Sequence, residues 1–217
     1  MRFILSCLPL LLIASLALAI ALTAFKEKRG IFKTTFLLPM AVPVASVVFL
    51  WQVFFSEQGM INGLLVKFGA EPINWINSDM AFYVLVFTYL WKNIGYDMLL
   101  YLAGLSDISP SLYEAAEVDG AGAWQRFTKI PLPGLRGTFF TVVVLSLLNS
   151  FKVFREAYLL AGNYPHKSIY MLQHIFNNWF TKLDIEKICA AAVLMALAMI
   201  LFILIIQKLL VRKSEGI

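Results

Sequence analysis

Three long stretches without a charged side chain constrain the fold of this chain more than any other feature. They cover residues 3–25, 34–55 and 188–207. An apolar helix of about 20 residues crosses the roughly 30 Å of hydrocarbon in a bilayer. With 60% hydrophobic residues and a mean hydropathy of +0.79, the chain has too little polar surface for a water-soluble globule. The sequence therefore predicts a protein that folds in a membrane.

Two further apolar stretches are interrupted by charge. Residues 80–105 contain Lys92 and Asp97, and residues 138–161 contain Lys152, Arg155 and Glu156. We predict an all-α membrane protein, a polytopic helical bundle formed as one domain over residues 1–217. Its expected spans are residues 3–25, 34–55, 80–105, 138–161 and 188–211, with one long polar loop at 106–136.

The distribution of Lys and Arg predicts the orientation. Four lie in the loop at 26–33, three in the polar loop and three in the tail after residue 207, whereas the other side holds five. Positive charge collects on the cytoplasmic side of membrane proteins. We therefore expect a cytoplasmic C-terminus and a cytoplasmic polar loop. The basic residues flank the membrane rather than forming one patch, which argues against a nucleic-acid partner.

The predicted external N-terminus is unusual, because Met1-Arg2 runs directly into a membrane segment. One explanation is a cleaved signal peptide, since Ala17-Leu18-Ala19 resembles a cleavage site. The other is an upstream span that this chain lacks.

The polar loop begins like a helix, with Ser109 as a plausible N-cap and Pro110 at the first helical position. Gly120 and Gly122 interrupt it, and a second short helix is expected from Ala123 until the prolines that follow. Small alanines and a flexible glycine suit a helix that docks into the groove of a partner. The alternative is an amphipathic helix that lies on the membrane surface.

The spacing Glu114-Ala115-Ala116, Gly120, Ile130 and Leu132-Pro133 matches all seven fixed positions of a known signature loop. In this the chain resembles the membrane subunits of ATP-binding-cassette importers, and its flanking residues resemble the branch that imports sugars. The resemblance implies that the loop is a coupling helix seated on a cytoplasmic ATPase subunit. The residues expected to couple are Glu114, Ala115, Ala116, Asp119, Gly120, Ile130, Leu132 and Pro133.

The resemblance covers about residues 25–211 and implies the function and the partners. The chain would be a multi-pass permease subunit in the plasma (inner) membrane of a prokaryote, forming part of a path for sugars or oligosaccharides. The expected partners are a dimer of ATP-hydrolysing subunits, a second related permease, and an extracellular or periplasmic solute-binding protein. The family usually has six spans, so the first would be missing here. The loop at 161–165 departs from the family pattern and leaves the sugar unassigned.

No Gly-x-x-x-x-Gly-Lys-Ser/Thr phosphate loop is present, so ATP would be bound by the partner, and we expect no enzyme activity and no cofactor. His166 and His174 lie in an external loop without metal-ligand spacing and are interpreted as ordinary surface histidines. Cys7 and Cys189 are interpreted as packing residues. No metal site is proposed.

Polar residues recur within two of the predicted spans. Tyr89, Asn93 and Asp97 repeat every four residues, and Ser146, Asn149, Lys152 and Glu156 follow steps of three, three and four, which predicts two polar stripes. Lys152 could pair with Glu156, whereas Lys92 and Asp97 each need a partner on a neighbouring helix. These stripes either line a translocation path or form structural pairs, and we favour the structural interpretation. The path candidates are Tyr89, Asn93, Asp97, Asn149, Lys152 and Glu156.

Two other functions remain open. An ion-driven secondary carrier would use Lys92, Asp97 and Glu156 as coupling groups. A membrane scaffold would bind partners without transporting anything.

Overall fold

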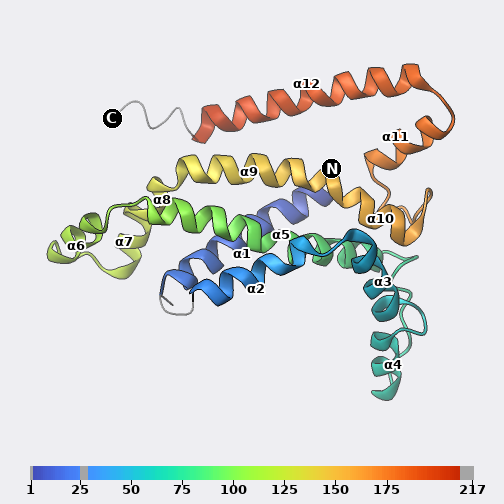
Figure 1. Ribbon diagram of the computed structural model, residues 1–217, viewed down its shortest axis with the longest axis horizontal. Helices are drawn as coiled ribbons and strands as arrows, with labels where there is room; N and C mark the ends of the chain where they lie inside the picture. Colours follow the sequence, from blue (N-terminus) through green and yellow to red (C-terminus); the bar gives the residue numbers. More distant parts are fainter. Residues whose placement is uncertain (1, 25–28, 211–217) are drawn as a thin grey trace.

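The computed structural model describes residues 2–24 and 29–210, and within these ranges the chain is helical with no strand (Figure 1). The predicted all-α fold is confirmed. The elements are α1 (Arg2–Ala24), α2 (Arg29–Ala41), α3 (Val44–Phe55), α4 (Met60–Lys67), α5 (Met80–Ser106), α6 (Pro110–Val118), α7 (Ala123–Lys129), α8 (Pro131–Gly134), α9 (Arg136–Ser150), the 3₁₀ turn η1 (Phe151–Val153), α10 (Phe154–Ala161), α11 (Leu172–Thr181) and α12 (Ile185–Leu210).

Helix α5 lies at the centre of the bundle, where it packs against α1, α2 and α9 (Figure 1). One apolar cluster joins these helices through Leu12 of α1, Met98 and Tyr101 of α5, and Val142 of α9. A second cluster near the other half of α5 joins Leu11 and Tyr89 to α10. Because protein surrounds α5 on several sides, this helix can carry polar groups that lipid would not accept.

Four stretches are long and apolar enough to cross a membrane, namely Arg2–Thr23, Val44–Lys67, Arg136–Ala161 and Ile185–Leu209. Three of them match predicted spans, apart from residues 25 and 211, which lie outside the described ranges. Helix α5 forms over the predicted residues 80–105 but is absent from the four, because Lys92, Asn93 and Asp97 make it less apolar. Helix α12 exposes most of its apolar side chains, as expected for contact with lipid or another membrane subunit.

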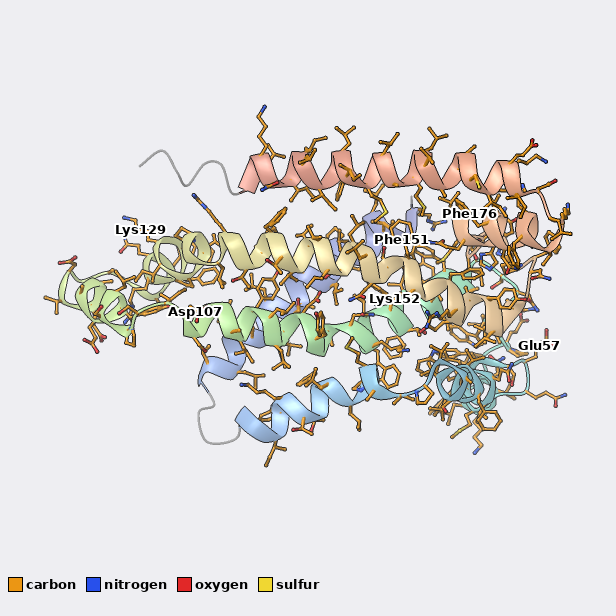
Figure 2. All side chains as sticks on the ribbon, turned by 45° about the horizontal axis from the view of Figure 1, so that its top comes forward. Glu57, Asp107, Lys129, Phe151, Lys152 and Phe176 are labelled. Atoms are coloured by element: carbon orange, nitrogen blue, oxygen red, sulfur yellow. The ribbon has the colours of Figure 1, made fainter. Side chains whose placement is uncertain are left out.

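The predicted span at 34–55 does not form one continuous helix. Helix α2 ends at Ala41, Pro43 adopts φ −57° and ψ 141°, and α3 starts at Val44. Proline has no N–H to donate to the preceding turn and disfavours helical backbone at the residue before it. After this break α3 and α4 run crosswise to α1, α5 and α9 (Figures 1 and 2). The segment is apolar over the predicted length, but Pro43 interrupts its helix.

The connecting segments separate onto two ends of the bundle. Helices α6–α8 and the last described turn of α12 lie at one end, and α3, α10 and α11 lie at the other (Figure 1). The first end carries Arg126, Lys129, Arg136 and Lys208, which agrees with the charge count used for the orientation. The side of the membrane that each end faces stays a prediction.

Two glycines allow α5 to approach its neighbours closely. A Cβ atom at Gly95 would overlap the backbone carbonyl of Phe36 on α2, and one at Gly104 would overlap the side chain of Thr138 on α9. Neither overlap involves a side chain that could swing far away. The bundle around α5 is therefore tightly fixed at both crossings.

Candidate functional site

The polar loop folds as the predicted helix, glycine turn and helix. Helix α6 starts at Pro110 after Ser109, although the Ser109 hydroxyl contacts that of Ser111 rather than capping the helix. Gly120 closes α6 with φ +72°, a backbone conformation that glycine adopts without strain. Its amide donates to the Glu117 carbonyl at 3.1 Å, and the Ala121 amide donates to the Ala116 carbonyl at 2.9 Å. These two bonds form a Schellman motif, which explains why the turn needs a glycine.

The second half of the loop is anchored on the ends of α5 and α9. Helix α7 is followed by a single helical turn, α8, so the two prolines continue the chain in helical geometry instead of opening it. Pro131 and Leu135 are buried. A Cβ at Gly134 would lie 3.1 Å from Cδ1 of Ile108, which shows how closely α8 sits against the end of α5. The base of the polar loop is therefore packed into the bundle.

Helices α6, α7 and α8 each expose apolar side chains. The exposed fractions are 54% for Leu112, 87% for Val118, 74% for Trp124 and 48% for Leu132. Large apolar side chains grouped on a polar element mark an interaction surface. Of the predicted coupling residues, the exposed ones are Glu114, Ala115, Asp119, Gly120 and Leu132, and the half-buried ones are Ala116, Ile130 and Pro133.

One ion pair links the two helices of the loop. Nη1 of Arg126 lies 3.4 Å from Oε2 of Glu117. The Glu117 side chain is 75% exposed, and a pair of this kind contributes about 0–1 kcal/mol. The side chain of Gln125 also accepts the Gly122 amide at 3.2 Å at the start of α7. The angle between the helices is set mainly by the glycine turn.

The predicted stripe on α5 faces α9 and forms a buried polar interface. The Tyr89 hydroxyl donates to the Ser146 carbonyl at 2.6 Å, and the Ser146 hydroxyl donates to Oδ2 of Asp97 at 2.6 Å. Asn93 donates to the Tyr89 carbonyl at 2.8 Å. Tyr89, Asp97 and Ser146 are 0–2% exposed. Ser146 on α9 is thus the neighbouring partner expected for Asp97.

Lys92 also finds its partner on a neighbouring helix. Its Nζ lies 3.0 Å from Oε1 of Glu156, and the two side chains are 12% and 8% exposed. The predicted pairing of Lys152 with Glu156 is therefore wrong, because Glu156 points to α5. Lys152 instead donates to Oδ1 of Asn149 at 2.8 Å.

The second predicted stripe does not form one face. Ser146 and Glu156 are buried, whereas Asn149 is half-buried and Lys152 is exposed. The 3₁₀ turn Phe151–Val153 interrupts the α-helical periodicity on which the prediction depended. The stripe splits into an inward pair, Ser146 and Glu156, and an outward pair, Asn149 and Lys152.

The interpretation of His174 as a surface residue is wrong. The side chain is 0% exposed and lies between Phe154 and Tyr170, with ring centroids 4.8 and 5.2 Å away. Its Nδ1 accepts the Met171 amide at 3.0 Å and so caps the start of α11. Burial lowers the pKa of this imidazole. His174 links α11 to the start of α10 and to Tyr170. Among the described residues, no group of three or more His, Cys, Asp or Glu could hold a metal ion.

Asn62 is a structural residue whose role the sequence did not predict. Its side chain is 2% exposed. Its Nδ2 donates to the carbonyls of Ser56, Glu57 and Ile73, and its Oδ1 accepts from the Ile73 amide and the Trp75 indole. These bonds join α4 to the following loop. Neither the periodicity nor the charge of the sequence marks this position, because most of the partners are backbone groups brought together by the fold.

The comparisons with known proteins all find membrane components of transport systems. The model of one family, described as binding-protein-dependent transport system inner membrane component, matches residues 12–215. The trehalose/maltose transport system permease protein MalF of Thermococcus litoralis is 34% identical over 155 residues, with 70% of this chain and 52% of the relative covered. The sulfoquinovosyl glycerol transport system permease protein SmoG of Agrobacterium fabrum is 36% identical over 167 residues, with 75% and 54% covered.

A solved structure supports the same fold. A chain of a bacterial ABC transporter involved in the import of the acidic polysaccharide alginate superposes with a TM-score of 0.79. It is 24% identical, and the match covers 97% of this chain and 77% of that one. This chain spans about half the length of the curated relatives that it matches.

Proposed function

The chain belongs to the family of binding-protein-dependent transport system inner membrane components, and from this membership we propose that it is the permease subunit of an ATP-binding-cassette importer for sugars or oligosaccharides. The relatives named for trehalose and maltose, for arabinooligosaccharides and for lactose support a carbohydrate as the transported class. The chain contributes membrane helices and a docking element, and the ATP chemistry belongs to another subunit.

The main observation for this proposal is that the polar loop exposes apolar side chains while its base is packed into the bundle. Its helices α6 and α7 expose Val118 and Trp124, large apolar side chains that an isolated polar loop has no reason to present to water. Its base is packed against α5 and α9 through Leu135 and Ile108. An element that is exposed at its tip and fixed at its base can pass the motion of a docked partner to the bundle.

The mechanism that follows is alternating access. A solute-binding protein delivers the sugar on the external side, and ATP closes a cytoplasmic ATPase dimer. Closure pushes the polar loop. The loop in turn moves α5 and α9, because its base is packed against both helices. A ligand or partner shifts such a two-state equilibrium only through different affinities for the two states, and ATP-dependent dimer closure supplies this difference.

The partners and the location follow from the same proposal. A second related permease completes the path, because the helices of this chain surround α5 rather than a pore. The chain lies in the plasma (inner) membrane of a prokaryote with its C-terminus and polar loop in the cytoplasm. Exposed basic residues at the polar-loop end, including Lys129 and Arg136, support this orientation.

The test is the substitution Glu114→Lys, which inverts one charge on the exposed face of α6. In the complete importer reconstituted in vesicles, ATP-driven sugar uptake should fall at least about 10-fold, because the docking surface is electrostatically mismatched. Insertion and thermal stability of the chain should not change. The matched control is Glu71→Lys, the same inversion at an exposed residue on the opposite end.

Unchanged uptake by the Glu114→Lys importer would contradict the proposal. The same vesicles separate the other functions. A proton ionophore should leave uptake intact, whereas an ion-driven carrier would stop. A scaffold would show no ATP-dependent uptake in either variant.

A further inference from the structure

The outward face of the interrupted helix α9–η1–α10 carries cations. Its exposed positions after the first turn are Thr141, Leu148, Lys152, Arg155 and Leu159, separated by seven, four, three and four residues. The 3₁₀ turn Phe151–Val153 lies within this run, but residues three apart stay on the same side of the chain in both kinds of helix. Lys152 and Arg155 therefore sit side by side, with apolar neighbours above and below them on the same face.

Neither cation has a carboxylate partner within the described chain. Lys152 bonds only to the amide oxygen of Asn149, and no interaction of Arg155 is recorded. The nearest acidic side chain in sequence, Glu156, is already paired with Lys92. Asp97 is 0% exposed and bonded to Ser146. The outward face thus keeps two positive charges that this chain does not neutralise.

Lys152 lies within Arg136–Ala161, a segment long and apolar enough to cross a membrane. It lies nine residues, or about 14 Å, before the end of the helix at Ala161. Figure 2 shows it part-way along the bundle, between Asp107 and Lys129 at one end and Glu57 at the other. Its bond to Asn149 directs the ammonium group toward the middle of the helix, away from the nearer end. A lysine that reaches for the headgroups would point the other way.

A cation at such a depth is costly when it faces lipid, so intramembrane cations face a wet path or an anion. A passing neutral sugar could accept hydrogen bonds from Lys152 and Arg155 but would leave both charges uncompensated. A carboxylate, sulfonate or phosphate would compensate them and form charge-assisted hydrogen bonds. We infer that Asn149, Lys152 and Arg155 line the translocation path and that the transported saccharide is anionic. This inference rests on the proposed function and names its substrate class.

The test uses the complete importer, with its second permease, ATPase and binding protein, in vesicles. The probe is a mixture of neutral oligosaccharides with uronate, sulfonated and phosphorylated ones of similar size, and mass spectrometry identifies what is imported with ATP. We expect only acidic saccharides inside. The double substitution Lys152→Gln with Arg155→Gln should raise KM for them at least about 10-fold, as expected for the loss of charge-assisted contacts.

Two matched variants sharpen the result. Lys167→Gln with Lys182→Gln removes the same charge from exposed positions outside the membrane and should leave KM unchanged. Lys152→Arg with Arg155→Lys keeps both charges and should retain most of the uptake. Together they separate a local contact from a change in net charge.

The inference is overturned by import of neutral saccharides by the unmodified importer, or by acidic uptake that the double substitution does not change. It is also overturned if that variant no longer copurifies with the second permease, because the cations would then serve subunit contact. All three results leave the proposed function standing. Absence of ATP-dependent import of any saccharide would instead overturn the proposed function, and the inference with it.

Discussion

The polar loop at residues 106–136 and the buried interface between α5, α9 and α10 use opposite means to hold their shape. The loop depends on backbone geometry, with a left-handed glycine at 120 and a surface ion pair between Glu117 and Arg126. The interface depends on side chains that share hydrogen bonds away from water, among them Asp97 with Ser146 and Lys92 with Glu156.

The difference teaches where substitutions should alter folding and where they should alter function. A buried polar group that loses its partner bears the full cost of desolvation, whereas an exposed group exchanges its partner for water. The interface is therefore sensitive to the identity of its side chains. The loop tolerates side-chain changes structurally, so its exposed residues are free to serve a partner.

The two regions should differ most in unfolding free energy when one carboxylate is removed from each ion pair. Glu156→Leu leaves Lys92 charged and buried, and should lower the free energy of unfolding by about 3–5 kcal/mol. Glu117→Leu removes the exposed pair with Arg126 and should change it by less than about 1 kcal/mol. Denaturant unfolding in detergent micelles measures both. Equal losses in the two variants would show that the regions do not differ as described.

A second substitution tests the close packing of α5 against α2. Gly95→Ala places a methyl group against the Phe36 carbonyl, and overpacking of this kind costs about 1–3 kcal/mol. Gly137→Ala is the control, because nothing lies within 4 Å of its Cβ position and alanine favours a helix. Melting temperatures in detergent should fall for the first and stay or rise for the second. A Gly95→Ala protein as stable as the original would contradict the close contact between α2 and α5.

The smallest effect is expected at the glycine turn of the loop. Gly120→Ala has room for its methyl group but must adopt φ +72°, which costs about 1–2 kcal/mol. The melting temperature should not change, because the loop can rearrange without opening the bundle. Amide hydrogen exchange in α6 should become faster instead. Gly122→Ala, at φ −67°, is the matched control and should exchange at the original rate.

The helices and the polar loop were predictable because local chemistry specifies them. Uncharged runs of sufficient length predicted α1 and α12, and Pro110 with Gly120 predicted both ends of α6 within a residue. The same local reasoning missed the break at Pro43 and the 3₁₀ turn at Phe151–Val153. A proline can either kink a span or end it, and the neighbouring packing decides between the two.

Partners across the bundle could be expected but not named from the sequence. The spacing of Lys92 and Asp97 showed that each needed a partner on a neighbouring helix, yet it gave no means of naming Glu156 for Lys92 or Ser146 for Asp97. The burial of His174 and Asn62 was not predictable from the sequence, since a single histidine or asparagine on a short helix has no periodicity that reveals it.

The sequence by itself determined that the chain belongs in a bilayer, which residues form its longest helices, and which loop carries the exposed motif. These properties depend on hydrophobicity, backbone preference and charge, which act over a few residues. Only the tertiary structure decided which polar groups meet and which cations remain outward and unpaired. That outcome depends on crossings between helices far apart in sequence, such as those at Gly95 and Gly104, where sub-ångström packing selects one arrangement.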